Sequence, residues 1–137
     1  MLEQVLLIAG ATIIGLLGSV HLVYTFFTRR FEPRDAATAE LMKATSPLLT
    51  RETTMWRAWV GFNASHSLGA IGFAVFLIVL AIIRFDVIRA APVFAWLAVV
   101  NGLAYLALAK LYWFRVPLVG IALANICFLA AAVRLSV

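Results

Sequence analysis

Four apolar stretches of membrane-spanning length constrain this chain more than any other feature of its sequence. They cover about residues 5–27, 59–83, 92–112 and 116–133. About 20 apolar residues in a helix cross the hydrocarbon core of a bilayer. In lipid, backbone N–H and C=O groups must find partners within the protein, which a helix provides. The sequence therefore predicts an all-α integral membrane four-helix bundle, with residues 1–137 as a single transmembrane domain.

The composition agrees with lipid as the surrounding solvent. Hydrophobic residues make up 65% of the chain and charged residues only 12%, against about 25% charged in a soluble domain. The net charge of +5 comes from basic residues at the ends of the apolar stretches. They form no basic patch for a groove, so nucleic acid is not expected as a partner. With Cys127 as the only cysteine, an internal disulfide and a multi-cysteine metal motif are excluded.

The distribution of Lys and Arg predicts the orientation. On the side where the first and third stretches end, the chain carries eight basic residues: Arg29, Arg30, Arg34, Lys43, Arg51, Arg57, Lys110 and Arg115. The opposite side carries three: Arg84, Arg89 and Arg134. The positive-inside rule then places a loop of about 30 residues, between the first two helices, in the cytoplasm. We expect a multi-pass protein of the cell inner membrane with both termini outside the cytoplasm.

Within this loop, Ala37, Leu41, Ala44 and Leu48 recur at helical spacing. This pattern predicts a short amphipathic helix on the membrane surface. Such a helix serves either as an interfacial anchor within a connector or as a lid over the cytoplasmic end of the bundle.

The two histidines of the chain are the most informative polar residues. His21 lies in the first stretch and His66 in the second, and antiparallel helices bring them to nearly one depth, roughly 7 Å from the membrane centre at about 1.5 Å per residue. Helical spacing places other polar residues on the same two faces: Tyr24 and Thr25 beside His21, and Asn63 and Ser67 beside His66. Because polar groups at this depth are costly, these six residues are the candidate ligand-binding site.

Small residues and two asparagines predict how the helices pair. Ala11, Gly15 and Ser19 recur every four positions in the first stretch, as do Gly61, Ser65 and Gly69 in the second. Such ridges let helices approach closely, so we expect the first two helices to pair through them. Asn101 and Asn125, in the third and fourth stretches, are expected to hydrogen-bond to each other.

Three interpretations of the histidine pair stay open. The imidazoles fix helix register by hydrogen bonding; or both ligate one haem iron as axial ligands; or they line a pocket for a lipid-like or quinone-like ligand. Close helix packing argues against room for a porphyrin. The function we favour is a membrane protein that binds a small hydrophobic ligand or cofactor at His21 and His66. The alternative is a non-catalytic accessory or structural subunit of a larger membrane complex or homo-oligomer.

Several kinds of chemistry have no residues to carry them. None of the four stretches holds an Asp or Glu at depth, which a proton-coupled exporter of this size needs. The sequence has no H-E-x-x-H motif and no nucleophile elbow, so a conventional hydrolase or zinc site is not expected. These residues do not decide whether the chain is an enzyme, and they favour a non-catalytic role.

Two segments carry a resemblance. The runs Gly18-Ser-Val-His-Leu-Val-Tyr-Thr-Phe and Trp59-Val-Gly-Phe-Asn-Ala-Ser-His-Ser-Leu-Gly resemble those of a group of small four-span bacterial integral membrane proteins. The resemblance covers the first two stretches and the loop, about half of the chain. It implies a bacterial membrane protein and no particular activity or cofactor.

Overall fold

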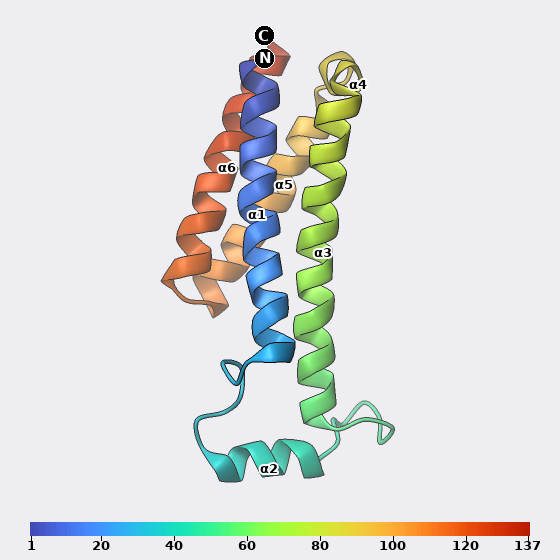
Figure 1. Ribbon diagram of the computed structural model, residues 1–137, viewed down its shortest axis with the longest axis vertical. Helices are drawn as coiled ribbons and strands as arrows, with labels where there is room; N and C mark the ends of the chain where they lie inside the picture. The colour runs from blue at the N-terminus through green and yellow to red at the C-terminus, as the bar shows by residue number, and fades with distance from the viewer. The chain divides into compact units, whose positions relative to one another are not determined.

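A computed structural model describes residues 1–137 as an all-helical chain, with 82% of the residues in six α-helices and no β-strand (Figure 1). The helices are α1 (Leu2–Phe27), α2 (Ala36–Ala44), α3 (Met55–Ile83), α4 (Phe85–Ala90), α5 (Val93–Tyr112) and α6 (Arg115–Ser136). Four of them, α1, α3, α5 and α6, are long and apolar enough to cross a membrane. These four correspond to the predicted stretches. The short helix α4 was not anticipated.

The chain forms two compact units, and both α1 and α3 contribute to each. Unit 1 consists of residues 1–17 and 70–137, and unit 2 of residues 18–69.

In unit 1, five helical segments, from α1, α3, α4, α5 and α6, pack around one core. The Gln4 side-chain amide of α1 donates a 2.9 Å hydrogen bond to the Ala81 carbonyl of α3. Glu3 of α1 pairs with Arg134 of α6 at 2.8 Å, and the Trp96 indole N–H of α5 donates to Ser136 of α6 at 3.1 Å. Both chain termini therefore lie at the same end of this unit (Figure 1).

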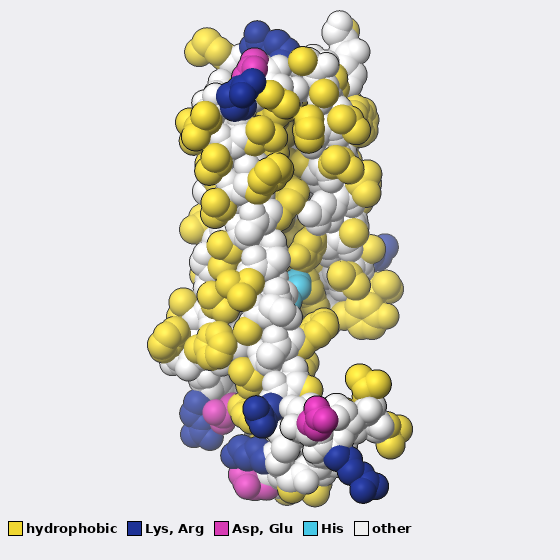
Figure 2. All heavy atoms as spheres, turned by 90° about the vertical axis from the view of Figure 1, so that its right-hand side faces the viewer, with side chains coloured by type: hydrophobic (Ala, Val, Ile, Leu, Met, Phe, Trp, Pro, Cys, Tyr) yellow, Lys and Arg dark blue, Asp and Glu magenta, His cyan; other side chains and the backbone are white.

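The core of unit 1 is built from small residues, and its outer surface from large ones. Ten of the seventeen buried apolar residues are alanine, which lets the helix backbones approach closely. Large side chains such as Leu97, Val100, Leu103 and Ile126 are more than half exposed instead. Figure 2 shows hydrophobic side chains covering the visible helical surfaces. A water-soluble protein has the opposite arrangement, with its large apolar residues inside.

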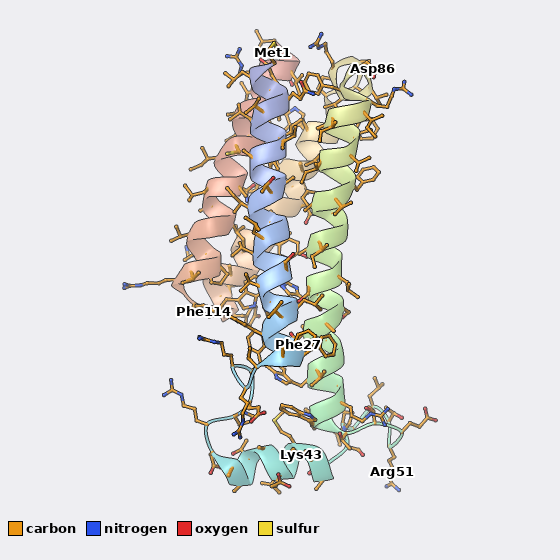
Figure 3. All side chains as sticks on the ribbon, in the orientation of Figure 1. Met1, Phe27, Lys43, Arg51, Asp86 and Phe114 are labelled. Atoms are coloured by element: carbon orange, nitrogen blue, oxygen red, sulfur yellow. The ribbon has the colours of Figure 1, made fainter.

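Unit 2 contains the end of α1, helix α2 and the start of α3. Asp35 caps α2: its carboxylate accepts hydrogen bonds from the Thr38 hydroxyl at 2.7 Å and from the backbone N–H groups of Thr38 and Ala37. These bonds, with the one from the Thr38 hydroxyl the largest cause, lower the pKa of Asp35 below its usual 3.8. An N-cap carboxylate of this kind satisfies N–H groups that the helix itself leaves free. Figure 3 shows Lys43 on α2 and Arg51 on the loop that follows.

A helix is present in this loop, as predicted, but it is shorter than expected. It ends at Ala44, so Leu48 lies outside it and is fully exposed. The reason is Pro47, because proline disfavours a helical conformation at the residue before it.

The small-residue ridge predicted for α3 was wrong. Gly61, Ser65 and Gly69 are all exposed, and a Cβ atom built on Gly61 meets nothing within 4 Å. The face that α3 buries carries Asn63, Ser67, Ala70 and Ala74. The ridge on α1 is confirmed in part: Ala11 is buried, and a Cβ on Gly15 would lie 3.0 Å from the Ala74 Cβ. Spacing alone identified small residues on two faces of α3 and could not tell which one is buried.

The predicted hydrogen bond between Asn101 and Asn125 was also wrong. The Asn125 side chain is buried on α6, and neither its nitrogen nor its oxygen has a hydrogen-bond partner. It lies against Gly102 of α5, at 2.6 Å from the position of a Cβ atom built there. Asn101 instead lines a mostly apolar cavity of about 380 Å³ between α3 and α5. Adjacent residues on a helix point about 100° apart. Gly102 of α5 faces Asn125, and Asn101 beside it therefore points elsewhere.

Candidate functional site

A hydrogen bond joins α1 to α3 at the predicted site in unit 2. His21 Nε2 and Asn63 Oδ1 lie 2.9 Å apart. The Asn63 amide nitrogen donates to the Trp59 carbonyl at 2.8 Å, which orients the amide so that its oxygen faces His21. Since an amide oxygen can only accept, His21 donates from Nε2. This hydrogen bond holds the imidazole in one orientation. Nδ1 is the ring nitrogen that takes no part in the bond to Asn63.

The His66 ring lies against the His21 ring, while Asn63 is the hydrogen-bond partner of His21. The ring centroids of the two histidines are 5.3 Å apart, and the rings meet edge to face at 68°. His66 lies one helical turn after Asn63 on α3, so both side chains reach the same side of the helix. The predicted proximity of the two imidazoles is therefore observed, with Asn63 on the same face of α3 as His66.

Two hydroxyl groups of the predicted site, those of Thr25 and Ser67, are turned toward their own helices. Thr25 donates to the His21 carbonyl at 2.8 Å, and the buried Ser67 donates to the Asn63 carbonyl at 2.9 Å. Such bonds to the residue four positions earlier are common for Ser and Thr within helices. The two hydroxyls retain their acceptor lone pairs, while their protons are already used.

The loop after α1 returns to the helices through Phe31, which sequence reasoning did not select. The Phe31 ring lies 4.5 Å from the His21 ring and 6.3 Å from the Tyr24 ring. Its carbonyl accepts a 3.1 Å hydrogen bond from the Trp59 indole N–H. Tyr24 also packs under the Arg30 guanidinium, 4.9 Å from the ring centroid. Phe31 thus fixes the loop against both α1 and α3.

Between this loop and the two helices lies a cavity of about 230 Å³. It is lined by Thr25, Phe26, Thr28, Phe31, Glu32, Trp56, Trp59, Val60 and Asn63. Of the six predicted site residues, Thr25 and Asn63 line the cavity. His21, His66, Tyr24 and Ser67 lie outside its lining, and His21 reaches it through its hydrogen bond to Asn63. The cavity is displaced from the histidine pair toward the loop.

Haem ligation by His21 and His66 does not fit this geometry. An iron bound by two imidazoles, at about 2 Å from each nitrogen, holds the ring centres about 6 Å apart with the porphyrin between them. Here the centroids are 5.3 Å apart, one ring points its edge at the other, and the Nε2 of His21 is occupied by Asn63. No cluster of three or more His, Cys, Asp or Glu side chains that could hold a metal ion is found either.

Comparison of the chain with protein-family models, curated protein sequences and solved structures found no match.

Proposed function

We propose that this chain is a multi-pass inner-membrane protein whose unit 2 cavity binds a small amphiphilic ligand, lipid-like or quinone-like. The observation that carries the proposal is the 230 Å³ cavity, whose lining combines aromatic side chains with polar groups, among them the His21-bound amide of Asn63. Small-molecule sites typically combine apolar walls with a few fixed polar groups. The hydrogen bond from His21 fixes the Asn63 amide, which is such a polar group.

Membrane insertion is supported by the four long helices and by the large apolar side chains on their outer surfaces. An α-helical protein of this kind belongs in an inner membrane, because bacterial outer-membrane proteins are β-barrels. The excess of Lys and Arg where the first and third spans end supports an orientation with the loop containing α2 in the cytoplasm and both termini outside.

Cysteine labelling tests this orientation. In a Cys127→Ser background, Thr45→Cys is expected to react with a membrane-impermeant maleimide in inside-out vesicles and not in intact cells. A cysteine at Val137 is expected to show the opposite pattern. Exchange of the two patterns would reverse the orientation, and labelling of both positions from one side would contradict a consistent four-span topology.

Ligand binding is tested with duroquinone and decanol as probes, measured by native mass spectrometry and by the thermal stability of the protein in mild detergent. A ligand present at about 100 times its Kd stabilises the folded state by about 2.7 kcal/mol. Val60→Phe fills the cavity and is expected to abolish binding. Val79→Phe makes the same change on α3 at a position outside the cavity lining and is expected to leave binding intact.

The histidine contribution is tested in the same assay. His21→Ala removes the hydrogen bond to Asn63 and is expected to weaken binding about threefold to tenfold, the usual effect of losing one hydrogen bond. Unchanged binding in both His21→Ala and His66→Ala would show that the two histidines only fix helix register.

The second candidate function is that of an accessory subunit or a homo-oligomer. The observation that favours it is the apolar cavity of about 380 Å³ in unit 1, whose wall includes Phe73, Phe76 and Phe94, with Asn101 as its polar residue. A polar side chain in such a surface can hydrogen-bond to a neighbouring helix in lipid. This candidate predicts that neither probe binds and that the purified particle has the mass of an oligomer or a larger complex.

A further inference from the structure

The unit 2 cavity has few free hydrogen-bond donors. The Thr25 and Thr28 hydroxyls donate to the carbonyls of His21 and Tyr24, at 2.8 and 3.0 Å. The Trp59 indole N–H and the Asn63 amide donate to backbone carbonyls as well. The Trp56 indole N–H and the second amide hydrogen of Asn63 are left on the wall. A ligand that must accept several hydrogen bonds would therefore find few donors in this lining.

The same wall is rich in groups that attract positive charge. Four of its nine residues are aromatic: Phe26, Phe31, Trp56 and Trp59. Aromatic ring faces attract cations, and tryptophan attracts them most strongly. The only charged residue in the lining is Glu32, a carboxylate.

None of the basic residues of unit 2 lines the cavity, and two of them, Arg29 and Arg30, have partners near it. Arg29 pairs with Glu32 Oε2 at 2.8 Å, and its side chain is 89% exposed, against 32% for Glu32. An ion pair this exposed is weak, so Arg29 can yield to a competing cation. Arg30 lies over the Tyr24 ring, and Tyr24 does not line the cavity. Within the lining, the groups that attract a cation are therefore four aromatic rings and the Glu32 carboxylate, which Arg29 pairs with from outside.

We propose that the cavity recognises an organic monocation of the quaternary ammonium type, with its charge beside Glu32 and against the tryptophan rings. The ammonium group belongs either to a free small molecule or to a lipid headgroup. This inference rests on the proposed ligand-binding function and names the chemical class of the ligand. A quaternary ammonium suits the cavity because it carries positive charge and needs no hydrogen-bond acceptor to be satisfied.

The test compares choline with 3,3-dimethylbutan-1-ol, in which a carbon atom replaces the charged nitrogen. The protein is held in nanodiscs of phosphatidylglycerol, and binding is measured by calorimetry and by tryptophan emission. Choline is expected to bind about tenfold or more tightly than the alcohol, because only choline gains the cation–π and carboxylate attractions.

Charge variants separate a binding role of Glu32 from a structural one. Glu32→Gln is expected to reduce choline affinity about tenfold and to leave the alcohol unchanged. Arg29→Gln breaks the same ion pair but frees the carboxylate, so choline is expected to bind more tightly. If the ion pair mattered only for structure, both variants would weaken binding equally, and the proposal would be overturned. The matched control is Glu40→Gln, since Glu40 pairs with Lys43 on α2 and does not line the cavity.

The remaining outcomes separate this inference from the function beneath it. Equal affinity for choline and the alcohol, or binding of duroquinone or decanol without choline, overturns cation recognition and keeps the ligand-binding function. Failure of every probe overturns both. Repeating the choline titration in phosphatidylcholine discs identifies the source: a lower apparent affinity indicates a lipid headgroup, and an unchanged one indicates a free cation.

Discussion

Replacing Gly10 with alanine is expected to destabilise unit 1 by about 1–3 kcal/mol, the usual cost of overpacking a filled core. A Cβ atom built on Gly10 of α1 lies 2.6 Å from Phe128 Cε1 and 3.0 Å from the Ala124 carbonyl oxygen of α6. The Phe128 ring is fully buried and meets Phe73 edge-on at a centroid distance of 6.0 Å. Because neither this ring nor the α6 backbone has room to retreat, the two helices must separate.

Gly72→Ala is the matched control, since a Cβ at Gly72 of α3 meets nothing within 4 Å. Alanine there is expected to be neutral or to stabilise by up to about 1 kcal/mol, because glycine is the poorer helix former. Unfolding in detergent by heat or by added SDS measures both variants. If Gly10→Ala were as stable as Gly72→Ala, the close approach of α1 to α6 would be refuted.

The second large effect is expected between Gly102 and Asn125. Gly102→Ala places a Cβ 2.6 Å from Asn125 Oδ1 and 2.7 Å from Nδ2, so it is expected to cost about 1–3 kcal/mol. Asn125→Ala removes a buried amide that has no hydrogen-bond partner. An unsatisfied buried polar group costs about 1–3 kcal/mol, and its removal offsets the small cavity that alanine leaves. The single Asn125→Ala variant is therefore expected to be close to neutral or more stable than the wild type.

The double variant completes this experiment. With Asn125 truncated, alanine at Gly102 has space, so most of its cost is expected to disappear. The coupling energy from the four unfolding free energies is expected to be about 1–3 kcal/mol, as for residues in direct contact. Additive effects would show that the two side chains do not meet, and a strongly destabilised Asn125→Ala would show that the amide has a partner.

Much of this fold follows from the sequence because helix formation in an apolar chain is a local property. The four long helices match the predicted stretches, and Pro92 and Pro117 fall at or near the starts of α5 and α6, as a proline without an N–H requires. The meeting of His21, Asn63 and His66 also follows, because helical spacing places the last two on one face and antiparallel helices bring the first to the same level.

The cavity could not be derived in the same way. Phe31 and Glu32 lie in an irregular loop, where no periodicity relates a residue to a face. The hydrogen bond from Trp59 to the Phe31 carbonyl that fixes them depends on the backbone path of the loop. The aromatic residues near the end of α1 and the start of α3 were a signal, but they are also typical of any helix end at a membrane surface.

The two wrong predictions of helix packing had a different cause. Two faces of α3 carry small residues, and only one of them is buried, so the choice depends on neighbouring helices that the sequence pattern does not specify. Likewise, Asn101 and Asn125 each occupy the middle of a helix, but the rotation of α5 turns Gly102 rather than Asn101 toward Asn125.

The hydrogen bond that closes the loop between α2 and α3 has a practical consequence for working with this protein. The Met55 N–H donates to the Thr45 carbonyl at 2.8 Å, which holds together the two ends of residues 46–54. At the tip, Leu49 is 93% exposed. Loops with adjoining ends and exposed tips are the sites where proteins accept inserted sequence. An epitope or a fluorescent reporter inserted at Leu49 would leave the two ends of the loop joined by this hydrogen bond. We therefore expect it not to disturb α2 or α3.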